Sequence, residues 1–326
     1  MKKFTIIICL SIGLSSFCQE RIAYSDTSKY YQFSVNYWFN MHHFLWLESF
    51  MNQELDSTLI SLEIDENSKN ELSKALAYYK TYLTKEDLRL SEYQTAFKNW
   101  ITQDENTLDI IPTEFVEHFK ILTEFSPTYQ ALFWKSHLEA CTKVLDENIS
   151  IIRNTEEKYV DRITKLTRQF WDFEPIKVDV TFYAKSSTWN PRNRPYTSIF
   201  PTHVVMNASG ENEVPGNWVE LLYHESAHHL ILGSSYFIGG TIKDVTEVKG
   251  LKPTRQLWHV ILFYLTGEVS KNLLQDHGIT YPETYMQRNN VFGRYHQLIE
   301  KHFRPYLTRE STLAESVENF ITEAAK

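Results

Sequence analysis

The hydrophobic pattern of this sequence changes period near residue 170, and this change limits the folds available to the chain. Between residues 128 and 170, apolar side chains recur every three or four positions, which indicates an amphipathic helix. Between residues 176 and 183, apolar and polar side chains alternate instead, as in a half-buried β-strand. A second strand is expected at residues 200–206. The fold class predicted is α+β, predominantly α, with a small sheet.

The chain divides at the same point into two expected regions. Residues 19–170 carry helical spacing and form a predicted helical N-terminal region, whereas residues 171–326 contain the strands. The N-terminal region opens with an aromatic-rich segment, Tyr30–Phe50, that has apolar residues on most faces and is therefore predicted to be a buried helix. With only 10 Gly and 10 Pro in 326 residues, the chain has no repeat or low-complexity segment.

The first eighteen residues, MKKFTIIICLSIGLSSFC, read as a secretory signal peptide, residues 1–18. A basic start is followed by an apolar core that is too short for a permanent membrane anchor. Cleavage after Cys18 predicts an exported protein, periplasmic or extracellular. The alternative is a lipoprotein signal in which Cys18 is lipidated, although Phe17 directly before it fits that poorly. Cleavage would leave Cys141 alone, so no internal disulfide is expected.

The charge balance excludes some classes of partner. The chain has 33 Lys and Arg against 41 Asp and Glu, a formal net charge of −8, and it contains no basic run. Nucleic acid and anionic membrane surfaces are therefore not expected partners. No run of about 18 apolar residues follows the signal peptide, so no membrane span is expected.

The stretch VELLYHESAHHLIL, residues 219–232, carries the clearest chemical signal. It is predicted to be a helix from about Trp218 to Gly233, and His224 and His228 stand four positions apart on it. Residues at that spacing share one helix face, so both imidazoles can bind one metal ion. Glu225 lies beside the first histidine, where it can act as a general base towards metal-activated water.

A catalytic zinc site needs a third protein ligand, and the sequence leaves three carboxylates open. Glu268 belongs to the apolar segment LWHVILFYLTGEVSKNLL, where a carboxylate is costly unless it is paired or bound to metal. Asp244 and Glu247 lie in a segment, GGTIKDVTEVKGLKP, that reads as an exposed loop. His259 stands nine positions before Glu268, half a turn out of phase, so it is not expected to meet the same ion and is interpreted as a core histidine or one that supports the ligands.

These segments together give the chain a resemblance to a known class. VDVTFYA, HESAH and LWHVILFYLTGE make it similar to the gluzincins, HExxH metallopeptidases whose third zinc ligand is a glutamate on a later helix. It resembles in particular a family of poorly characterised exported bacterial proteins of that type. The resemblance implies a zincin-like metallopeptidase region over residues 171–326, with zinc (Zn2+) bound by three side chains: His224, His228 and Glu268.

The resemblance also implies an activity. The expected function is that of a secreted zinc peptidase that hydrolyses peptide or protein substrates through a zinc-activated water, with Glu225 as the general base. A second donor to the developing oxyanion is expected after the Glu268 helix, where Tyr285 is the candidate, with Tyr281 and Arg288 nearby. The alternative is a metal-binding or ligand-binding envelope protein without catalytic turnover.

Overall fold

The fold was analysed in a computed structural model of the chain. It describes the following residues: 22–51, 64–103, 110–171, 174–184, 193–199, 201–210, 214–231, 236–252 and 256–325. The predicted signal peptide, residues 1–18, lies outside these ranges. Within them, helices predominate and a single five-stranded sheet is present. The predicted α+β, predominantly α fold class is confirmed.

The sheet is mixed and has the strand order β1-β2-β3-β5-β4. Its strands are β1 (Ile22–Thr27), β2 (Tyr31–Asn36), β3 (Ile176–Thr181), β4 (Tyr196–Ile199) and β5 (Thr202–Asn207). The pairs β2–β3 and β3–β5 are parallel, while β1–β2 and β4–β5 at the two ends are antiparallel. Helices cover both faces, which suits a sheet with parallel strands at its centre.

The N-terminal region is not purely helical, because it supplies two strands of this sheet. The prediction of a helix from Tyr30 onwards is wrong as far as Asn36, and α1 (Tyr37–Met51) begins only after it. Tyr31, Phe33 and Val35 are fully buried and are separated by single polar residues, which is the two-residue period of a strand. β2 then pairs with β3 across the predicted boundary at residue 170, so the two regions share one sheet.

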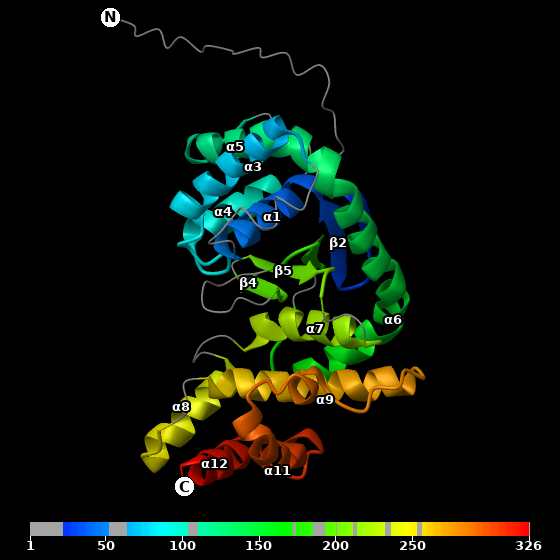
Figure 1. The fold of residues 1–326 in the computed structure, drawn as a ribbon. Helices are drawn as coiled ribbons and strands as arrows, with labels where there is room; N and C mark the ends of the chain where they lie inside the picture. Colours follow the sequence, from blue (N-terminus) through cyan, green and yellow to red (C-terminus); the bar gives the residue numbers. More distant parts are fainter. Residues whose placement is uncertain are drawn as a thin grey trace, which may run out of the picture.

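Helices before residue 135 form a lobe on one face of the sheet (Figure 1). They are α1, α3 (Glu66–Tyr78), η1 (Tyr79–Leu83), α4 (Glu92–Ile101), η3 (Thr113–Phe115), α5 (Val116–Tyr129) and η4 (Gln130–Trp134). Buried rings pack between them, among them Tyr37, Tyr79, Phe97 and Tyr129. The lobe is therefore built around an aromatic core.

The long helix α6 (Lys135–Thr167) runs along one side of the molecule and joins this lobe to the other face of the sheet (Figure 1). There lie α7 (Asn217–Ser226), η5 (Ala227–Leu230) and α9 (Leu257–Asp276), and further out α8 (Phe237–Lys249), α10 (Tyr285–Arg288), η6 (Gly293–Tyr295), α11 (His296–Leu307) and α12 (Leu313–Ala324). α7, which carries the HExxH motif, packs between the sheet and α9. The motif is thus enclosed by two layers.

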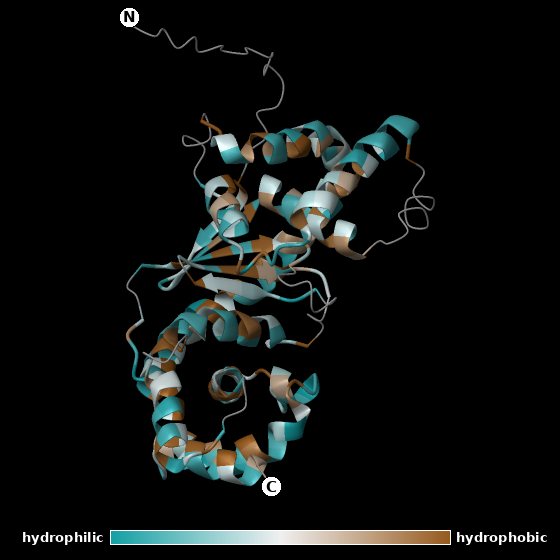
Figure 2. Ribbon diagram, turned by 90° about the vertical axis from the view of Figure 1, so that its left-hand side faces the viewer, coloured by the Kyte–Doolittle hydropathy of each residue, from teal (hydrophilic) through white to brown (hydrophobic). Residues whose placement is uncertain are grey.

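Hydrophobic residues gather on the strands and on the helix sides that face the interior (Figure 2). α9 is buried almost all round, since α6, α7 and α11 all contact it. No helix in the described ranges combines the length and the apolar character needed to cross a membrane.

Candidate metal centre

The HExxH residues lie where α7 changes into a tighter helix. His224 and Glu225 belong to the last turn of α7, and His228 follows in the 3₁₀ turn η5. Despite this change, the rings of His224 and His228 remain neighbours, with centroids 4.9 Å apart. Glu225 Oε2 lies 3.7 Å from His228 Nε2. The two histidines and the glutamate therefore face one site.

A third histidine completes the group, and it comes from α9. A ligand nitrogen from each of His224, His228 and His259 lies within 4.8 Å of the other two, and no other group of His, Cys, Asp and Glu in the described residues is arranged in this way. His224 Nε2 and His259 Nε2 are 3.3 Å apart. The expectation that His259 does not approach the same ion position as the histidine pair is wrong.

The spacing of these nitrogens fits a tetrahedral ion. Two nitrogens that each lie 2.0–2.1 Å from a tetrahedral zinc are separated by about 3.3 Å. Burial lowers the pKa of His224 and of His228 well below the usual value, and that of His259 to about 4. All three imidazoles are therefore neutral at pH 7, which is the form that binds a metal.

Thr266, two turns after His259 on α9, fixes which nitrogen of His224 is free. Its hydroxyl donates to the carbonyl of Leu262 at 2.8 Å, so its oxygen can accept from His224 Nδ1, 3.3 Å away. With the proton on Nδ1, Nε2 is left bare and points at His259. The ring of Phe263 stacks on His224 with centroids 3.6 Å apart and holds its orientation.

Glu225 is held from the sheet side by Thr197 of β4. The Thr197 hydroxyl lies 2.9 Å from Glu225 Oε2 and 2.8 Å from the Glu225 carbonyl oxygen. Burial raises the pKa of Glu225 to about 7, and the Thr197 hydrogen bond and the charge of Arg89 oppose that rise. A carboxyl with a pKa near neutrality is suited to proton transfer at neutral pH.

Arg89 adds a positive charge from the N-terminal lobe. It stands in the turn between η1 and α4, and its side chain is 42% exposed and 3.7 Å from Asp87. After burial itself, its charge is among the causes that lower the pKa of His228 and of His259. The lobe is thus electrostatically coupled to the site on α7 and α9.

Glu268 is not part of the histidine cluster, which corrects the prediction that it is the third ligand. Its Oε2 lies 3.4 Å from a guanidinium nitrogen of Arg304 on α11, and burial raises its pKa. The reason is helical phase: nine residues separate it from His259, and nine steps of 100° place the two side chains on opposite sides of α9. Since His259 faces α7, Glu268 faces α11.

Asp244 and Glu247 also lie outside the cluster. The segment expected to be a loop forms α8, and both carboxylates are exposed on it. Glu247 lies 3.9 Å from Lys243, one turn earlier on the same helix. Neither residue is a ligand candidate in this arrangement.

The predicted oxyanion donors surround another carboxylate, Glu220, one turn before His224 on α7. Tyr281 donates its hydroxyl to Glu220 at 2.6 Å, and a guanidinium nitrogen of Arg288 lies 2.8 Å from the Tyr281 hydroxyl. Tyr285 donates its backbone N–H to Glu220 at 2.9 Å, while its ring lies 6.5 Å from that of Phe263. A catalytic role for Tyr285 stays a prediction.

Four functional candidates were not identified as such from the sequence: His259, which was given another role, and Thr197, Thr266 and Arg89. His259 carried a usable signal, because an ionisable side chain within LWHVILFY is as unexpected in a buried helix as Glu268 is. Thr197, Thr266 and Arg89 carry no comparable signal. Their roles depend on which elements pack against α7.

The chain was compared with known proteins. No protein-family model matches it, and no match was found among curated proteins or solved structures.

Proposed function

We propose that this protein is a zinc-dependent hydrolase that cleaves peptide bonds, with zinc held by His224, His228 and His259. The proposal rests on one observation above all, the convergence of the three imidazoles with Glu225 beside them. Three protein ligands leave a fourth tetrahedral position for water, which distinguishes a catalytic zinc site from a closed structural one. Zinc bound there would act as a Lewis acid and bring the pKa of coordinated water to about 7.

The chain's own groups account for the proton transfers. Glu225 accepts a proton from the attacking water and later donates it to the leaving amine nitrogen as the C–N bond breaks. Thr197 holds Oε2 of Glu225 through its hydroxyl, so the base does not have to be ordered during the reaction. Phe263 and the half-buried Trp258 beside His259 supply apolar walls that limit access of bulk water.

The histidine set replaces the glutamate ligand that the gluzincin resemblance implies. The proposal therefore depends on the HExxH pair and on His259, and a gluzincin ligand set is not part of it. A metal-binding protein without turnover would need the same histidines but would not need Glu225 as a base.

The test combines metal content with hydrolysis. The wild-type protein, loaded with zinc and dialysed, should hold one ion and cleave members of a fluorogenic peptide library. Glu225→Gln should keep the ion and lose about 10²–10⁴-fold in kcat. Glu268→Gln changes a carboxylate on the far side of α9, so this variant should keep both the bound zinc and the hydrolysis.

Each contrary result has a distinct meaning. Failure to bind zinc would reject the site, and undiminished cleavage by Glu225→Gln would reject the assigned base. Zinc binding by a wild-type protein that cleaves no peptide would leave the metal-binding alternative.

A further inference from the structure

The edge strand β4 is buried on both of its faces. It has only four residues and pairs with a single neighbour, β5. Tyr196, Thr197 and Ser198 are each no more than 3% exposed. Successive strand residues point to opposite faces, so Thr197 faces α7 while Tyr196 and Ser198 face the N-terminal lobe.

The α7 face of β4 carries the contact with the catalytic candidate. Thr197 is the hydrogen-bond partner of the Glu225 carboxylate, at 2.9 Å. A hydrogen bond of this kind weakens over a few tenths of an ångström, and a one-residue slip of the strand would turn Thr197 to the other face. The position of Glu225 therefore depends on how firmly β4 is held.

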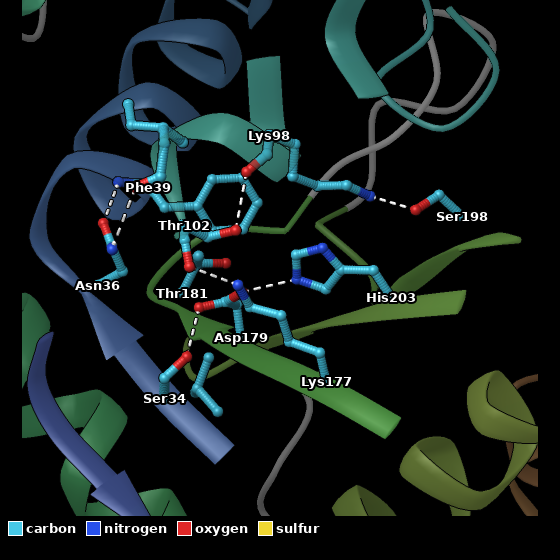
Figure 3. A network of polar contacts seen from close by, with 12 residues as sticks. Ser34, Asn36, Phe39, Lys98, Thr102, Lys177, Asp179, Thr181, Ser198 and His203 are labelled. Atoms are coloured by element: carbon cyan, nitrogen blue, oxygen red, sulfur yellow. Dashed lines mark hydrogen bonds and ion pairs between the residues drawn. The ribbon is translucent and has the colours of Figure 1, made fainter. Parts of the chain in front are cut away.

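The lobe face of β4 is held by two polar contacts. Lys98 of α4 donates from Nζ to the Ser198 hydroxyl, as Figure 3 shows above the Asp179–His203 pair. The Tyr196 hydroxyl lies 3.0 Å from Nε2 of His43 on α1, and Lys98 Nζ lies 5.3 Å from the centroid of the Tyr196 ring. Two helices of the lobe thus contact a strand whose backbone pairs with one neighbouring strand, β5.

A lysine at position 98 carries a large desolvation cost. It is 1% exposed, and within the described residues no carboxylate lies within 4.0 Å of its Nζ; the nearby Asp179 pairs with His203. Burial lowers its pKa to about 7. An unbranched apolar side chain of similar length, such as Met, would fill the same space without that desolvation cost. Stability therefore does not explain a lysine here.

We propose that Lys98 and Ser198 are positioning residues for Glu225, through which the N-terminal lobe holds β4, and with it Thr197, against the carboxylate. The inference rests on the proposed function, in which Glu225 is the base. It gives the N-terminal lobe a definite part in the reaction. The path runs from Lys98 to Ser198, along one peptide unit of β4 to Thr197, and across to Glu225.

The test uses Lys98→Met and Ser198→Ala in the full chain, with Lys80→Met, an exposed lysine of the same lobe, as the matched control. Lys98→Met should raise the melting temperature while lowering kcat about 10- to 100-fold with unchanged zinc content and KM, since small misplacements of a catalytic group have effects of this size. A purely structural lysine would not separate stability from kcat in this way. Lys80→Met should match the wild type.

A double-mutant comparison tests the path itself. If Lys98 acts through Thr197, Lys98→Met should lower kcat strongly in the wild-type background and little in a Thr197→Val background. Equal effects in both backgrounds would overturn the path.

Crystal structures separate this inference from the proposed function. In Lys98→Met the Thr197–Glu225 hydrogen bond should be lost, whether or not the protein cleaves peptides. If the wild type shows no hydrolysis but the Thr197–Glu225 hydrogen bond is lost in Lys98→Met, the proposed function fails and the positioning stands. If the wild type cleaves peptides and the variant keeps both contact and kcat, the positioning fails and the function stands.

Discussion

His224 and His259 bring their Nε2 atoms to 3.3 Å although 35 residues separate them in the chain. Two nitrogens this close, on the buried ring of His224 and the half-buried ring of His259, have either one shared proton or one shared ion between them. His228 Nε2 or Nδ1 joins them within 4.8 Å, and a shared proton would not explain why a third imidazole converges on the same point.

Replacement of His259 should separate the histidine set from the carboxylate alternative. His259→Ala should weaken zinc binding by more than about 100-fold, because changes in groups that only support a ligand already cost about 10–100-fold. Competition with a chromophoric chelator measures the affinity. Glu268→Gln is the control, with an affinity equal to that of the wild type. If instead Glu268→Gln bound zinc weakly and His259→Ala bound it as the wild type does, Glu268 would be the ligand.

Thr266→Val should weaken zinc binding less, by about 10–100-fold. The change keeps the shape of the side chain but removes the acceptor for His224 Nδ1–H, so the tautomer with bare Nε2 loses its support. Thr246→Val on α8 is the matched control, since the Thr246 hydroxyl donates to a carbonyl of its own helix, that of Lys243. If the wild type, Thr266→Val and Thr246→Val had equal zinc affinities, Thr266 would not select the tautomer.

Lys98 should make stability depend on pH in the alkaline range. Its pKa is lowered from 10.5 to about 7 by burial, so between these values the unfolded chain binds more protons than the folded one. Stability contributed by this group therefore rises as pH increases from about 7 to 10.5, by an amount on the order of 4–5 kcal/mol. Below pH 7 the group is protonated in both states, so it adds no pH dependence to the free energy of unfolding.

Urea unfolding at several pH values checks this sign. The difference in unfolding free energy between Lys98→Met and the wild type should be largest near pH 7 and shrink towards pH 10. A difference independent of pH would mean that Lys98 keeps an ordinary pKa in the folded protein.

Glu220→Ala should destabilise the segment that follows α9. The Glu220 carboxylate accepts from the Tyr281 hydroxyl and from the backbone N–H of Tyr285, and the substitution leaves both donors buried without it. A loss of about 2–4 kcal/mol is expected, measured by urea unfolding. The exposed Glu247→Ala should change stability by less than about 0.5 kcal/mol. If Glu220→Ala lowered the free energy of unfolding no more than Glu247→Ala does, the segment would be held by packing alone.

The sequence by itself determined the fold class and the position of several elements. Period-two alternation located β3 and period-3.6 spacing located α6, because both elements keep one face buried along their whole length. It also identified HESAH as the segment that carries two neighbouring imidazoles, since that relation is local to one helix. The strands at the start of the N-terminal region escaped notice because an aromatic-rich run can be read with either period.

Only the tertiary structure decided which side of α9 meets α7. α9 is apolar on nearly every face, so its pattern does not say where His259 and Glu268 point, and both looked equally out of place in the sequence. The packing of α9 between α7 and α11 turns His259 to the histidine pair and Glu268 to Arg304. The contacts of Glu225 with Thr197, and of Ser198 with Lys98, likewise join segments far apart in the chain, and no local spacing encodes them.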